Sequence, residues 1–130
     1  MKIIIIISTI LLLITGCATP ESLKEKGASY TFTASKTPQE LHRCLLAEFD
    51  QKLGIYTHIL RETPENNFRI LSSHPDEGLL SIIDINREDK LLNILIYTAY
   101  CDVGNCDWHP FAKKVKKALT ICGAKETAKK

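Results

Sequence analysis

Apolar and polar positions divide the N-terminal part of the chain into two stretches. Residues 3–14 are apolar except for two hydroxyl residues, and one basic residue, Lys2, precedes them. This run is shorter than the roughly 20 residues of a membrane-spanning helix, and it has the length of a signal-peptide core. The following stretch is largely polar. We therefore expect a signal peptide over residues 1–16 and a tether over residues 17–28.

The next segment changes from a strand pattern to a helix pattern. Residues 29–34 alternate between apolar or aromatic side chains and hydroxyl side chains, which predicts a strand. Thr37-Pro38-Gln39-Glu40 then has the sequence of a capping box with proline at the first helical position. Apolar residues recur at helical spacing up to Leu53, so the sequence predicts a helix after the first strand.

The rest of the chain predicts a strand meander and a second helix. The strands are expected over residues 55–62, 68–72, 79–86 and 91–100. The last helix ends at Cys122 and has an apolar stripe flanked by lysines. We expect an α+β domain over residues 29–123 in the order β-α-β-β-β-β-α, with a single mostly antiparallel sheet and both helices packed on one face. Residues 124–130 are expected to form a flexible tail.

Composition excludes some classes of protein. The chain has 130 residues, 17 basic and 15 acidic side chains and a net charge of +2. Strong electrostatic binding of nucleic acid needs a larger basic surplus, so we expect no nucleic-acid partner. The chain is 45% hydrophobic, which is too high for a disordered protein, and its length allows one domain.

The apolar run ends in Ile14-Thr15-Gly16-Cys17. This tetrad resembles the lipobox of bacterial lipoproteins, in which an aliphatic residue and two small residues precede a cysteine. The resemblance implies cleavage before Cys17, a diacylglycerol on its sulfur and an acyl chain such as palmitate on its new amine. Two or more acyl chains anchor a protein stably in a membrane. Ala18 in place of aspartate favours, by analogy with enterobacterial sorting, an outer-membrane location facing the periplasm.

The cysteine count fits this interpretation. The chain has five cysteines, and lipidation of Cys17 leaves an even number in an oxidising compartment. Four cysteines predict two disulfides with three possible pairings. Cys44 and Cys122 each lie on the apolar stripe of a predicted helix, and Cys101 and Cys106 flank a short loop. We expect the pairs Cys44–Cys122 and Cys101–Cys106.

Two alternatives to disulfides are weaker. Cys101, Cys106 and His109 lie close together in the sequence, but a structural zinc site has four ligands and no fourth ligand is adjacent. His42 and Cys44 are two positions apart on a helix and do not face each other. The sequence also lacks G-x-S-x-G, P-loop and H-E-x-x-H motifs. We expect no metal, no cofactor and no enzymatic activity.

The mature domain resembles a set of uncharacterised, small proteobacterial lipoproteins with two cysteines. The shared outline is a polar tether, a hydroxyl-rich first strand, a helix that opens with Thr-Pro and carries a cysteine, a strand meander and a C-terminal helix that ends in cysteine. The matching segments are residues 30–34, 37–40, Cys44 and residues 120–122. The resemblance supports the Cys44–Cys122 pairing and implies no specific biochemical activity.

Apolar residues occur on both faces of the predicted sheet. A sheet face in water should be polar, so the second face either meets a partner or is covered by a segment such as the tether or the tail. Modest burial on both sides of a small sheet is the other explanation. The candidate partner face consists of Tyr56, Leu60, Leu80, Ile82, Leu95 and Tyr97.

Two functions are compatible with these features. The first is a membrane-anchored, non-catalytic lipoprotein of the cell envelope with a binding or structural role, whose partner is an envelope protein or a second copy. The alternative is a periplasmic inhibitor or immunity lipoprotein that blocks a hostile enzyme with the loop over residues 101–106. The lysines of the last helix are expected to form a solvated face; contact with anionic lipid or cell-wall polymer is the other reading.

Overall fold

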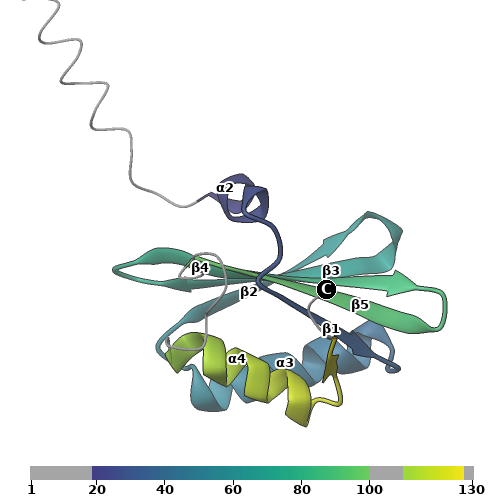
Figure 1. Cartoon of the computed structure of the whole chain (residues 1–130). Coiled ribbons are helices and arrows are strands. Elements are labelled where there is room, and N and C mark those ends of the chain that lie inside the picture. The colour runs from purple at the N-terminus through teal and green to yellow at the C-terminus, as the bar shows by residue number, and fades with distance from the viewer. Residues whose placement is uncertain (1–18, 100–109, 128–130) are drawn as a thin grey trace, which may run out of the picture.

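Six strands form one antiparallel sheet in the order β2-β3-β4-β5-β1-β6 (Figure 1). The computed structural model describes residues 19–99 and 110–127. The strands are β1 (Tyr30–Ala34), β2 (Thr57–Thr63), β3 (Asn67–His74), β4 (Gly78–Glu88), β5 (Leu91–Thr98) and β6 (Lys125–Glu126). A short 3₁₀ turn, η2 (Pro64–Asn66), joins β2 to β3. The predicted α+β class and the antiparallel meander are confirmed.

Two helices, α3 (Pro38–Lys52) and α4 (Pro110–Ile121), lie side by side on one face of the sheet (Figure 1). The start of α3 is the predicted capping box. The Glu40 N–H donates to Thr37 Oγ1 at 3.3 Å, and the Thr37 N–H donates to the Glu40 carboxylate at 3.0 Å. Each bond satisfies a donor that has no partner within the helix. At the same end of the layer, Gly123 follows α4 with φ +88, a conformation that glycine adopts without strain.

The main core fills the space between this helix layer and the sheet. The helices contribute Leu41, Leu45 and Phe49 from α3 and Phe111 and Leu119 from α4, all at most 2% exposed. The strands contribute the residues that alternate toward the helices, among them Phe32, Ile70, Ile83, Ile85, Leu92, Ile94 and Ile96. The prediction that both helices cover the same face is confirmed.

The folded part extends beyond the predicted domain at both ends. Pro20–Glu25, within the expected tether, forms a helix, α2, that lies on the sheet face opposite α3 and α4 (Figure 1). Ala124 is buried, and Lys125–Glu126 pair with β1 as β6, within the expected tail. The domain therefore spans more than residues 29–123.

An irregularity in β4 changes which side chains face the helices. Ser72 of β3 pairs with Ser81, but Ser73 pairs with Leu79, so Leu80 is an extra residue in β4. Such a bulge interrupts the strict alternation of side chains along a strand. Leu80 therefore joins the core on the helix side, whereas Ile82 packs on the opposite face.

Some predictions concern residues outside the described ranges. The signal peptide, Cys17, the Cys101–Cys106 pair and His109 lie there. Within residues 19–99 and 110–127, no helix is both long enough and apolar enough to cross a membrane.

Candidate functional site

The six residues of the predicted partner face do not share one face. Tyr56, Leu60 and Leu80 pack against the core beneath α3 and α4, whereas the other three lie on the opposite side of the sheet. The prediction of one common face is wrong because it assumed regular alternation. The bulge at Leu80 breaks the alternation in β4, and Leu60 pairs with Ile70, which faces the helices.

The other half of the predicted face is covered by the chain itself. Leu23 of α2, Ile82 of β4 and Tyr97 of β5 form a second buried cluster and are at most 8% exposed. Four partly buried residues surround them: Leu71, Leu79, Leu95 and Ala99. Of the explanations for two apolar faces, coverage by a segment of the tether applies to this part of the sheet.

A charged group beside this cluster ties α2 to the sheet. Arg69 Nε and Nη2 donate to the two oxygens of Asp84 at 2.6 and 3.0 Å, across neighbouring positions of β3 and β4. Lys24 Nζ of α2 lies 3.1 Å from Asp84 Oδ2 and 5.6 Å from the centre of the Tyr97 ring. The hydrogen bonds from Arg69 to Asp84 raise the pKa of the Arg69 guanidinium. Because Asp84 is only 6% exposed, it needs these two cations as partners.

The start of α2 is fixed by its own cap. The Ser22 N–H donates to Thr19 Oγ1 at 3.2 Å, and the Thr19 N–H donates to Ser22 Oγ at 2.9 Å. These reciprocal bonds satisfy two helix-end donors. The cap residue of α2, Thr19, lies two positions after Cys17 in the sequence.

One pair of side chains has the arrangement of a base and a nucleophile. His58 Nδ1 lies 2.8 Å from Ser72 Oγ, and His58 Nε2 lies 3.2 Å from the carbonyl oxygen of Leu53. A substrate has no access to this hydroxyl, since Ser72 is 0% exposed. Burial lowers the pKa of His58, although the Leu53 carbonyl opposes that shift. The ring links the end of α3 to β3 and stacks near Phe49, with ring centres 4.9 Å apart, so the pair serves packing.

The described part of the chain contains no candidate metal centre. In it, no three His, Cys, Asp or Glu side chains lie close enough together to hold an ion. The His42 ring packs 4.6 Å from the Phe68 ring. Burial, and then the charge of Arg43, lower the pKa of His42. The predicted absence of a Cys101–Cys106–His109 site concerns residues outside the described ranges.

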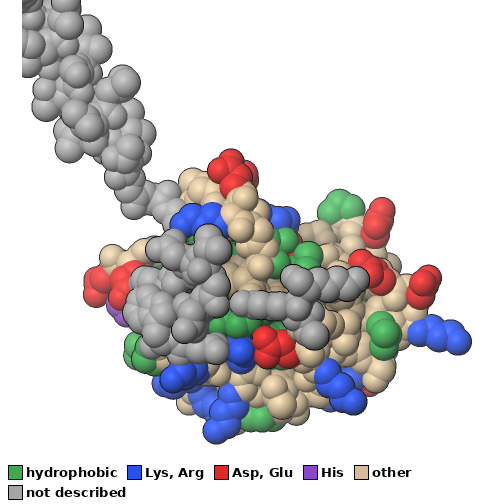
Figure 2. Space-filling view, in the orientation of Figure 1, with side chains coloured by type: hydrophobic (Ala, Val, Ile, Leu, Met, Phe, Trp, Pro, Cys, Tyr) green, Lys and Arg blue, Asp and Glu red, His purple; other side chains and the backbone are tan. Residues whose placement is uncertain are grey.

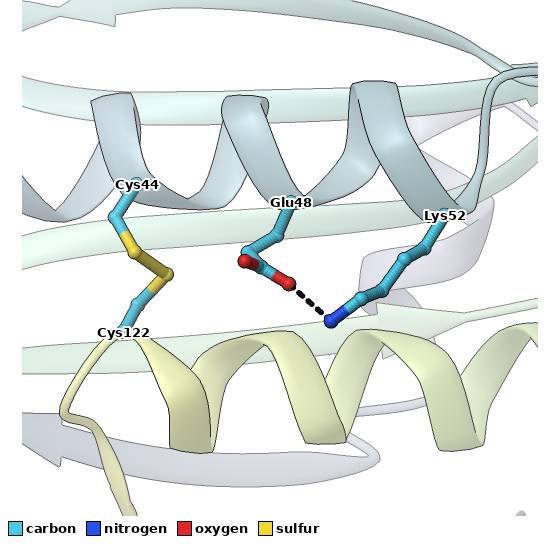
Figure 3. Close-up of a disulfide and its surroundings, with 4 residues drawn as sticks. All are labelled: Cys44, Glu48, Lys52 and Cys122. Atoms are coloured by element: carbon cyan, nitrogen blue, oxygen red, sulfur yellow. Dashed lines mark hydrogen bonds and ion pairs between the residues drawn. A yellow bond between two sulfur atoms is a disulfide. The ribbon is translucent and has the colours of Figure 1, made fainter.

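A disulfide joins the two helices of the main layer. Cys44 of α3 bonds to Cys122 directly after α4, with Cα atoms 5.7 Å apart across 78 residues of sequence (Figure 3). This pairing was predicted and is confirmed. In the loop-entropy model a closed loop of this length contributes about 4.5 kcal/mol to stability. On the same surface Glu48 and Lys52 form an ion pair within α3 (Figure 3).

Lysines gather on the outer side of α4 (Figure 2). Lys113, Lys114 and Lys117 are exposed. Lys116 is partly buried; its Nζ lies 3.4 Å from the Glu126 carboxylate and 4.5 Å from the centre of the Tyr30 ring. The lysines thus form a basic surface, hereafter the α4 lysine face, on the side of the molecule opposite α2.

The α2 helix is the feature that the sequence prediction missed. Its signal was present as Thr19-Pro20, a cap residue followed by proline at the first helical position. A single apolar residue, Leu23, is not enough to show helical periodicity. The segment therefore resembled a linker, although its one apolar side chain is buried.

No protein-family model and no curated protein matches this chain. The resemblance to small lipoproteins therefore rests on the residues quoted from this sequence.

Proposed function

We propose that this chain is a membrane-anchored, non-catalytic lipoprotein of the cell envelope, lipidated on Cys17 and facing the periplasm from the outer membrane. The observation that carries the proposal is the tetrad Ile14-Thr15-Gly16-Cys17 at the end of a short apolar run. Its small residues and cysteine are the chemistry that lipid attachment and cleavage require. The membrane is the first partner, through the lipid.

The cysteine chemistry of the domain supports an envelope location. Cys44 and Cys122 form a disulfide that clamps α3 to α4. Structural disulfides form and persist in oxidising compartments such as the bacterial periplasm and are rare in the cytosol. A chain that is exported through its N-terminal segment would form this bond after export.

A binding or structural role is supported by how the polar side chains of the domain are used. In the base–nucleophile pair of His58 and Ser72, the serine hydroxyl is buried. The Arg69–Asp84–Lys24 group holds α2 on the sheet. These groups stabilise the fold, and the exposed surfaces remain for contact with an envelope protein or a second copy.

The test is metabolic labelling with a fatty acid in a Gram-negative host that expresses the full chain. We expect label on the wild-type chain and none on Cys17→Ser. The matched control is the double variant Cys44→Ser/Cys122→Ser, which removes two other cysteines and keeps the label. A wild-type chain without label, or a labelled Cys17→Ser chain, would overturn the proposal.

The inhibitor or immunity function remains a second proposal. It rests on the loop between Cys101 and Cys106, because pre-ordering by a disulfide lowers the entropy cost of inserting a loop into an active site. Replacing residues 102–105 by glycine and serine should abolish protection of the host against the targeted enzyme while thermal stability is kept. Unchanged protection would exclude this loop as the inhibitory element.

A further inference from the structure

We propose that the sheet face that carries α2 lies against the lipid bilayer and that α3 and α4 face away from it. This inference rests on the lipidation of Cys17 proposed above and adds an orientation to it. The occupant of the α2 face, beyond α2 itself, is then the headgroup region of a phospholipid bilayer.

The number of residues between Cys17 and the cap of α2 limits how far the domain can lie from the lipid. A tether over residues 17–28 could reach several tens of ångströms, but Thr19 is already part of the domain, because its reciprocal bonds with Ser22 cap α2. Leu23 is only 4% exposed, so α2 is docked and not part of a loose linker. Two residue steps from Cys17 to Thr19 span at most about 7 Å. The domain is therefore held directly at the bilayer surface.

So short a link fixes which side of the domain faces the membrane. The attachment point, Cys17, lies two positions before the cap residue of α2. Helix α2 lies on one side of the sheet, and α3 and α4 lie on the other (Figure 1). A helix is about 10 Å in diameter, so the sheet and its helix layer together are thicker than the link is long. The domain cannot turn its α4 side toward the bilayer without undocking α2.

The chemistry of the α2 face suits a bilayer surface. Ile59 is 45% exposed and Leu91 is 50% exposed. Ile59 pairs with Leu71, and Leu91 alternates along β5 with Leu95 and Tyr97, so both lie on the α2 side. These two exposed side chains make the face that carries α2 partly apolar beyond the area that α2 covers. The charges of α2 and its C-cap residue balance, with Glu21 and Glu25 against Lys24 and Lys26. The lipid anchor, and not a net charge of this helix, therefore brings the face to the membrane.

The α4 lysine face then points into the periplasm. Its exposed lysines, Lys113, Lys114 and Lys117, lie on α4, and the sheet lies between α4 and α2 (Figure 1). One helix alone is about 10 Å in diameter, which exceeds the Debye length of about 8 Å at physiological ionic strength, so an anionic bilayer on the α2 side does not attract them. Contact of these lysines with the lipid of the same membrane would require the opposite orientation.

Lysines on both faces permit a direct test by chemical footprinting. The lipidated full chain is reconstituted in vesicles of phosphatidylethanolamine and phosphatidylglycerol and is treated with a water-soluble amine-acylating reagent; the reference is the chain from Ala18 onward, without lipid. Mass spectrometry measures the acylation rate of each lysine. We expect acylation of Lys24 and Lys26 to slow at least threefold on vesicles, whereas Lys113 and Lys117 react at unchanged rates.

A matched variant separates orientation from anchoring. Twelve glycine and serine residues inserted between Ala18 and Thr19 keep the lipid but add a flexible link of about 20 Å, and the protection of Lys24 and Lys26 should be lost. Protection of Lys113 and Lys117, equal protection of both faces, or no protection of a lipidated chain would overturn the orientation and leave the proposed function intact. A chain whose mass shows no lipid would overturn both.

Discussion

Lys24 Nζ lies 3.1 Å from Asp84 Oδ2, which ties a six-residue helix near the N-terminus to the centre of the sheet. The neighbouring Leu23 side chain is buried against Ile82 and Tyr97. These contacts turn part of an expected linker into part of the domain. They also determine how much free chain is left between the fold and the proposed lipid.

Removing the apolar contact of α2 should weaken the fold measurably. Leu23→Ala deletes most of a buried side chain from a small cluster, and we expect a loss of about 2 kcal/mol in unfolding free energy, at the low end for such substitutions. Glu25→Gln, on the exposed side of the same helix, is the control and should change stability by less than about 0.5 kcal/mol. Urea unfolding of the chain from Ala18 onward measures both. Equal stability of the two variants would mean that α2 is not docked.

Asp84, the acidic partner of α2, should contribute more to the unfolding free energy than a surface ion pair does. Asp84→Asn removes the carboxylate that Arg69 and Lys24 share in a nearly buried place, and we expect a loss of about 2 kcal/mol. Glu48→Gln breaks the ion pair with Lys52 on the surface of α3, and its expected loss is about 0.5 kcal/mol or less. The two losses are compared by urea unfolding at one pH. A larger loss in Glu48→Gln would contradict this ranking.

The disulfide between the helices should account for a large share of stability. The double variant Cys44→Ala/Cys122→Ala should lose about 2–5 kcal/mol of unfolding free energy. Reduction of the wild-type chain should produce a similar loss, and the reductant should have little further effect on the double variant. If oxidised wild type and double variant unfold at the same urea concentration, the bond does not constrain the chain as described.

Stability should fall in mildly acidic solution because of two partly buried histidines, His58 and His42. Burial lowers the pKa of His58 in the folded chain below the ordinary value of about 6.5. The unfolded chain therefore binds the proton first, so stability is full above about pH 6.5 and decreases as the pH falls through that value toward the folded pKa. His42 shifts in the same direction.

Unfolding free energies at pH 7.5, 6.5 and 5.5 check this prediction. The double variant His42→Gln/His58→Gln should show a weaker decline over this range than the wild type, whatever its stability at pH 7.5. If the unfolding free energy falls equally with pH in the wild type and in the double variant, these histidines do not couple protonation to folding.

The sequence predicted the elements whose signals are local and repeated. Thr37 and Glu40 form the capping box that their spacing indicated, and Cys44 and Cys122 meet because their helices share a sheet face. The elements that were missed have weak local signals. A six-residue helix with one apolar residue and a two-residue strand, Lys125–Glu126, form because tertiary contacts and pairing with β1 hold them.

The prediction of the candidate partner face was wrong for a different reason. Alternation assigns Leu80 and Ile82 to the same side, but one extra residue in β4 sends them to opposite sides. A bulge depends on pairing with the neighbouring strand, and nothing in the sequence of β4 itself marks its position. The coverage of Ile82 and Tyr97 by α2 was missed because of the weak local signal of α2 itself.

The mass of the mature N-terminal peptide tests the account most directly. Cleavage of the purified protein after Lys24 releases the peptide that extends from Cys17 to Lys24. The account predicts a peptide that begins at Cys17 and carries a diacylglycerol on sulfur and an acyl chain on the amine. A mature chain that begins elsewhere, or one with an unmodified Cys17, would contradict it.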